Sequence, residues 1–80
     1  MTTPVFPQDF NVKAHPVVPG ATHWTYPTSG DTVISVVGGG DFGLHGDGIN
    51  TFEMYDFRES EPQGYLTSDE INEHLDKNPI

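Results

Sequence analysis

The absence of cysteine constrains this short chain more than any other feature of its sequence. The chain has 80 residues, which is enough for one domain. A domain of this size buries only about 60–65% of the surface that its unfolded chain exposes, and such domains often add disulfides, a metal or a partner subunit. Without cysteine, disulfides, thiolate zinc sites and thiol nucleophiles are excluded, so we expect a small core held by packing.

A β-hairpin is predicted from two β-rich runs joined by turn residues. Residues 22–28 alternate so that Trp24 and Tyr26 share one face, and residues 32–37 are the most β-branched run in the chain. Between them, Ser29-Gly30-Asp31 has turn chemistry.

Two further strands are expected, at residues 42–45 and 50–57, on either side of the turn Gly46-Asp47-Gly48. In the second, Phe52 and Met54 share one face while Tyr55 and Phe57 share the other. Either both faces are partly covered or a bulge changes the register. Residues 58–64 read as a polar loop.

A helix is predicted over residues 68–77. Thr67 and Glu70 have the Thr-x-x-Glu spacing of a capping box, and Ile71 and Leu75 mark a buried stripe. Asn78-Pro79 is expected to end it.

Residues 1–21 are expected to form an extended proline-rich arm, because four prolines and the lack of periodicity argue against a helix. Its valines and phenylalanines predict that part of it lies over the core or pairs as an edge strand. The predicted fold is therefore α+β: an arm at residues 1–21, and a single domain at residues 22–80 with a small antiparallel sheet of about four strands and one C-terminal helix. A barrel-like sheet is an alternative.

Negative charge is concentrated in the second half of the chain. The formal net charge is −9, and residues 41–80 carry ten acids against Arg58 and Lys77. This asymmetry argues against direct binding to nucleic acid or anionic membranes, because both require positive charge. It suits a basic protein surface as partner. The alternative is that the acids only keep a small protein in solution.

The candidate binding residues follow from this charge. Asp69, Glu73 and Asp76 fall at i, i+4 and i+7 of the predicted helix, away from the Ile71/Leu75 stripe. The complete predicted acidic face comprises Glu53, Asp56, Glu59, Glu61, Asp69, Glu70, Glu73 and Asp76. Tyr55, Phe57 and Tyr65 are predicted as aromatic anchors for the partner. An ordinary solvated face remains the alternative.

Catalysis, cofactors and metals are not predicted. The glycine-rich segment 38–43 lacks the lysine that a phosphate loop requires, and no serine lies in a Gly-x-Ser-x-Gly elbow. The chain contains His15, His23, His45 and His74. No two of them have the i, i+4 spacing of a helical zinc site, although distant histidines can converge in three dimensions.

The expected location is the cytoplasm, because the first 19 residues contain four prolines and no apolar run is long enough for a signal peptide or a membrane span. In size and charge, carried by Glu53 to Asp76, the chain resembles the short acidic accessory proteins of bacteriophages, including DNA mimics and anti-restriction and anti-CRISPR inhibitors. That resemblance implies a stoichiometric inhibitor that engages a basic site on a host protein. The alternative is a small oligomeric structural or assembly protein of a larger particle, in which the arm wraps neighbouring subunits.

Overall fold

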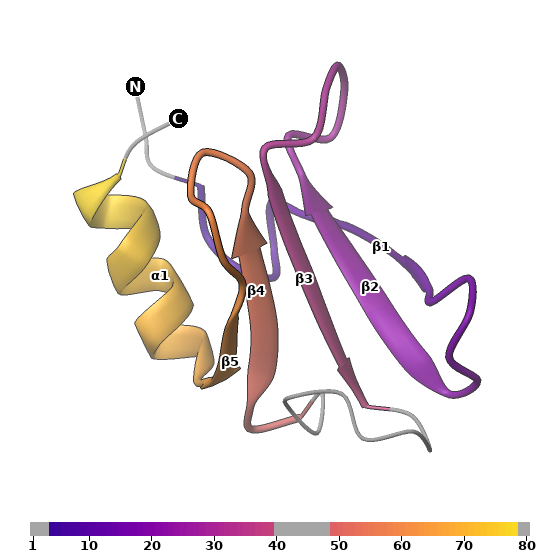
Figure 1. The fold of residues 1–80 in the computed structure, drawn as a ribbon. Coiled ribbons are helices and arrows are strands. Elements are labelled where there is room, and N and C mark those ends of the chain that lie inside the picture. The colour runs from indigo at the N-terminus through magenta and orange to yellow at the C-terminus, as the bar shows by residue number, and fades with distance from the viewer. Residues whose placement is uncertain (1–3, 40–48, 79–80) are drawn as a thin grey trace.

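The computed structural model describes residues 4–39 and 49–78, and it shows an α+β fold (Figure 1). One antiparallel sheet has the order β1-β2-β3-β4-β5 and precedes a C-terminal helix. The elements are β1 (Asn11–Ala14), β2 (Ala21–Tyr26), β3 (Ile34–Gly39), β4 (Phe52–Asp56), β5 (Gln63–Leu66) and α1 (Ser68–Lys77). The prediction of about four strands is wrong, since the sheet has five. The barrel alternative is also wrong, because β1 and β5 are outer strands.

The predicted hairpin is confirmed as β2 and β3. Trp24 pairs with Val36 and Tyr26 with Ile34, and the turn is closed by a hydrogen bond from the Val33 amide to the Tyr26 carbonyl at 2.8 Å. Gly30 has a φ of 80° in this turn, a conformation that side-chain-bearing residues rarely adopt. The predicted strand at residues 42–45 lies outside the described residues.

The pairing of β4 with β5 contains a bulge. Phe52 pairs with Leu66 and Met54 with Gln63, so that two residues, Gly64 and Tyr65, lie opposite Glu53. Strand β5 therefore begins inside the segment that was predicted to be a polar loop. Phe52 and Met54, which were predicted to share one face of this strand, are both buried in the core.

The core lies between one face of the sheet, α1 and the segment that precedes β1. It consists of Phe6, Phe10, Ile34, Val36, Phe52, Met54, Ile71 and Leu75. The ring of Phe6 makes edge-on contacts with those of Phe10, Trp24 and Phe52 at centroid distances of 5.2, 5.4 and 5.0 Å. Phe6 is also tied to the helix, since its amide donates to Asn72 Oδ1 at 2.7 Å and its carbonyl accepts from Asn72 Nδ2 at 3.3 Å.

The extended proline-rich arm is not matched by the structure. Phe6 and Phe10 supply core side chains, and residues 11–14 form β1. The expectation that part of this region pairs as an edge strand is confirmed by the pairing of β1 with β2. The region folds back because its phenylalanines bury more apolar surface against the sheet than an extended arm would.

The predicted helix at residues 68–77 is confirmed. Thr67 Oγ1 accepts from the Glu70 amide at 3.2 Å, and Glu70 Oε1 accepts from the Thr67 amide at 3.0 Å, which completes the capping box. Ile71 and Leu75 are fully buried. Within the described ranges, no helix has the length and apolar character needed to cross a bilayer.

Candidate functional site

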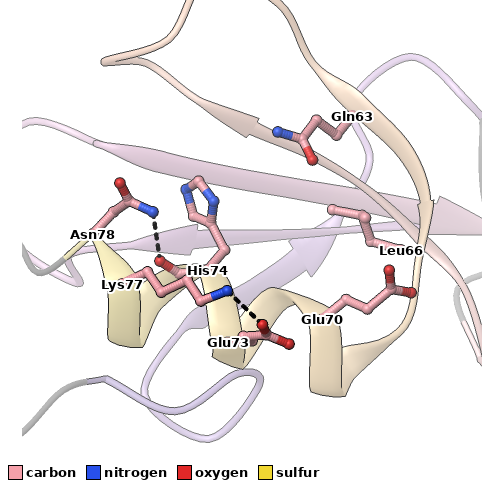
Figure 2. A pocket seen from close by; sticks show the side chains of 7 residues that line it. All are labelled: Gln63, Leu66, Glu70, Glu73, His74, Lys77 and Asn78. Carbon is pink, nitrogen blue, oxygen red and sulfur yellow. Dashed lines mark hydrogen bonds and ion pairs between the residues drawn. The ribbon is translucent and has the colours of Figure 1, made fainter.

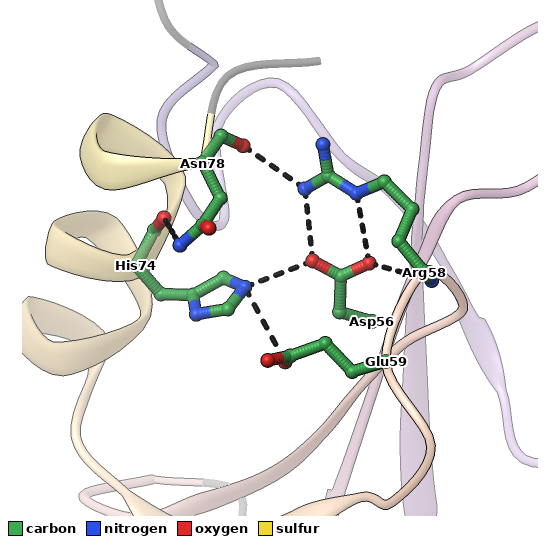
Figure 3. Close-up of polar contacts among 5 residues, drawn as sticks. All are labelled: Asp56, Arg58, Glu59, His74 and Asn78. Atoms are coloured by element: carbon green, nitrogen blue, oxygen red, sulfur yellow. Dashed lines mark hydrogen bonds and ion pairs between the residues drawn. The ribbon is translucent and has the colours of Figure 1, made fainter.

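A buried carboxylate stands at the end of β4, where the sheet meets the helix (Figure 3). Asp56 is only 2% exposed, and a buried charge requires partners to offset its loss of hydration. Arg58 supplies them in a forked arrangement: its Nε donates to Oδ1 at 3.0 Å and its Nη2 to Oδ2 at 2.8 Å. The Arg58 backbone amide adds a third hydrogen bond, to Oδ1 at 2.9 Å.

The helix and the loop after β4 complete this polar cluster. His74 Nε2 lies 2.9 Å from Asp56 Oδ2 and 3.8 Å from Glu59 Oε1, while Arg58 Nη2 donates to the Asn78 carbonyl at 2.9 Å. Hydrogen bonds from Arg58, and then from His74, hold the pKa of Asp56 well below its usual range, although burial acts in the opposite direction. The same pairing raises the pKa of Arg58. Asp56 is therefore ionised at neutral pH.

The prediction that Asp56 belongs to an exposed acidic face is wrong. Alternation along β4 places Asp56 on the same side as Phe52 and Met54, so its side chain faces the core. Sequence reasoning also missed Arg58 and His74 as its partners. Two features of the sequence could have indicated these partners. Arg58 follows Asp56 by two residues at the end of a predicted strand, and His74 lies in the last turn of the predicted helix.

A groove of about 250 Å³ lies beside this cluster, between α1 and β5 (Figure 2). It is lined by Gln63, Leu66, Glu70, Glu73, His74, Lys77 and Asn78. Lys77 Nζ contacts Glu73 Oε1 at 2.7 Å across one turn of the helix. His74 belongs to both the groove and the polar cluster, so the two features are continuous.

Six of the predicted acidic residues are exposed on the helix and on the loop between β4 and β5. We call this set the acidic surface: Glu59, Glu61, Asp69, Glu70, Glu73 and Asp76. Asp69, Glu73 and Asp76 lie opposite the buried Ile71 and Leu75 on α1, as their spacing predicts. Glu59 approaches the groove at His74. Glu53 lies elsewhere, half-buried on the face of the sheet that α1 does not cover.

Two of the three bases of the chain are engaged by its own acids. Arg58 pairs with Asp56, and Lys77 with Glu73. These pairs use two of the twelve acids, which leaves ten acids and one base, Lys13, in the sequence. Lys13 lies on β1, at the opposite edge of the sheet from the helix. The negative potential of the acidic surface is therefore only weakly offset nearby.

The predicted aromatic anchors are exposed, but the structure does not bring all of them to the acidic surface. Tyr55 points away from α1, because its neighbours Met54 and Asp56 face the core. Its ring contacts that of Phe57 edge-on at a centroid distance of 5.0 Å. Tyr65 lies opposite Glu53 in the bulge, with a φ of 57°. The sheet thus separates Tyr55 from the acids of the helix.

Sequence and fold comparisons do not connect this arrangement to known proteins. No model of a protein family, no curated protein and no solved structure matches the chain. A functional proposal therefore depends on the residues of this chain and their geometry.

Proposed function

We propose that this protein binds another protein rather than catalysing a reaction, and that its acidic surface engages a basic site on the partner. The observation that carries the proposal is the placement of six exposed carboxylates on α1 and the adjoining loop, while Arg58 and Lys77 are paired internally. Such a surface steers a basic partner electrostatically and orients it on binding.

A row of acids along a helix is one way to imitate the charges of a nucleic acid, so we extend the proposal to a partner that binds nucleic acid. A rise of about 1.5 Å per residue puts Asp69, Glu73 and Asp76 at axial intervals of about 6 and 4.5 Å. These intervals are of the same order as the axial step of about 3.4 Å between phosphates along one DNA strand. We propose that the protein acts as a stoichiometric inhibitor of this kind. As part of the same proposal, we place its action in the cytoplasm, with which the absence of cysteine is consistent.

The test compares two single substitutions that remove the same charge. A partner is first captured from host lysate at low salt and purified, and its affinity for each variant is then measured from 50 to 500 mM salt. We expect Asp76→Asn, on α1, to weaken binding and to flatten its salt dependence, while Asp31→Asn, in the β2–β3 turn, leaves both unchanged. Equal effects of the two would show that overall charge, not the acidic surface, drives binding.

A second candidate function is a small oligomeric structural component. It is favoured by the exposed Tyr55–Phe57 pair on the sheet face opposite α1, because exposed aromatic side chains often lie in protein interfaces. The mass of the purified chain in light scattering separates the two proposals. A mass above that of one chain, lost on Phe57→Ser, would support self-assembly through this face.

A further inference from the structure

Among the described residues, one group of three side chains offers metal-ligand atoms close to one another. Asp56, Glu59 and His74 each contribute one oxygen or nitrogen, and the three atoms lie within 4.8 Å of one another. They come from three parts of the fold: the end of β4, the loop after it, and the last turn of α1. In Figure 3, dashed lines join one ring nitrogen of His74 to both carboxylates.

The spacing of these atoms is close to what a zinc-type ion requires. Zinc binds imidazole nitrogen and carboxylate oxygen at about 2.0–2.2 Å, which places ligands of a tetrahedral site about 3.4 Å apart. His74 Nε2 is 2.9 Å from Asp56 Oδ2 and 3.8 Å from Glu59 Oε1. For one ion to bind all three, His74 Nε2 and Asp56 Oδ2 would separate by about 0.5 Å, and the Glu59 side chain, which is 43% exposed, would rotate toward them.

We propose that Asp56, Glu59 and His74 bind a divalent transition-metal ion such as zinc, with water in the remaining position. The ion occupies the place of the proton that joins His74 Nε2 to Asp56 Oδ2. That proton moves to Nδ1 of the ring or passes to solvent. One imidazole and two carboxylates favour zinc over calcium or magnesium, which prefer all-oxygen sites.

Arg58 acts on this site from outside the ligand shell. Its two hydrogen bonds orient the Asp56 carboxylate, as outer-shell partners of metal-binding carboxylates do. Its positive charge opposes the bound cation, whereas the net charge of −9 on the chain favours it. Arg58 therefore has two opposing effects on metal binding: it orients one ligand and repels the ion.

The consequence of binding is a metal-mediated link between the helix and the sheet. A small domain without disulfides gains folding free energy when a metal binds only its native state. At a free metal concentration about 100 times the dissociation constant, the melting temperature of a domain of this size should rise by about 10 °C or more. This effect needs no protein partner, although Glu59 belongs both to the metal site and to the acidic surface.

The experiment titrates the full chain with Zn²⁺ by calorimetry and with Co²⁺ by visible absorption, which reports the coordination geometry. We expect one saturable site with imidazole nitrogen among its ligands. Glu59→Gln, at an exposed position, should weaken binding by at least about tenfold. Asp56 is left unchanged, because loss of a buried carboxylate would disturb the fold itself.

The matched control is Asp76→Asn, which removes one exposed carboxylate from α1 without touching the three ligands. It should leave the affinity for Zn²⁺ unchanged within about twofold, since it removes no ligand and the interactions of fully solvated charges are weak. An equal loss in Asp76→Asn and Glu59→Gln would overturn the proposal, because it would indicate diffuse attraction of cations. The absence of saturable Co²⁺ or Zn²⁺ binding would overturn it as well.

Discussion

His74 Nε2 lies 2.9 Å from Asp56 Oδ2, and this contact joins the last turn of α1 to the end of β4. The two residues are 18 positions apart in the sequence. Asp56 also holds Arg58, whose guanidinium reaches the carbonyl of Asn78 beyond the helix. The cluster therefore fixes the C-terminal end of the helix against the sheet, at the side where the groove and the exposed carboxylates lie.

The ion pair between Asp56 and Arg58 should contribute strongly to stability, because Asp56 is buried. We expect Arg58→Leu to lower the free energy of unfolding by about 3 kcal/mol, because the buried carboxylate loses its main partner. Urea denaturation measures this change. The control is Glu73→Gln, which breaks the exposed pair with Lys77 and should leave stability nearly unchanged. Similar losses in both variants would contradict the role assigned to burial.

The segment before β1 should behave as part of the core. Phe6 is 2% exposed and contacts three aromatic rings, so Phe6→Ala should lower the free energy of unfolding by about 3–5 kcal/mol. Val5 precedes it in the chain but is exposed, and Val5→Ala should cost less than about 0.5 kcal/mol. If thermal melts show no difference between the two variants, the segment does not pack as described.

The capping box should set the stability of the helix start. Thr67→Ala removes the oxygen that accepts from the Glu70 amide and should destabilise the protein by about 1 kcal/mol. Thr67→Ser retains an accepting hydroxyl and should cost much less. Chemical denaturation of both variants, with helix content followed by circular dichroism, checks the prediction. Equal losses would mean that the hydroxyl bond does not stabilise the helix.

Acidification should destabilise the protein through His23. Burial, then the nearby His15 and Lys13, lower the pKa of His23 in the folded state. The unfolded chain therefore takes up a proton at a higher pH than the folded chain, so stability falls as pH drops below about 6.5. His23 Nε2 lies 2.7 Å from Ser35 Oγ, and His23→Gln retains a polar partner there. Melting temperatures from pH 8 to pH 5 should decline less in His23→Gln than in the parent chain; parallel declines would exclude His23 as the cause.

Local signals were sufficient for the helix and for the central hairpin. The capping box at Thr67 and Glu70, with the stripe of Ile71 and Leu75, predicts α1 with its observed bounds because each of these interactions spans only a few residues. The β2–β3 hairpin is likewise marked by its β-branched run and by the turn at Gly30. The exposed positions of Asp69, Glu73 and Asp76 follow from helical periodicity once the buried stripe is known.

Only the tertiary structure decided the remaining features, because they depend on partners distant in the sequence. Gly64 has a low strand propensity, and it joins β5 together with Gln63 through pairing with β4 across a bulge. Phe6 becomes a core residue because the aromatic side chains of β2 and β4 surround it. In the sequence, Asp56 is one more acid in an acidic stretch. The sheet buries its side chain, and its contacts with Arg58 and His74 place it at the centre of the helix–sheet junction.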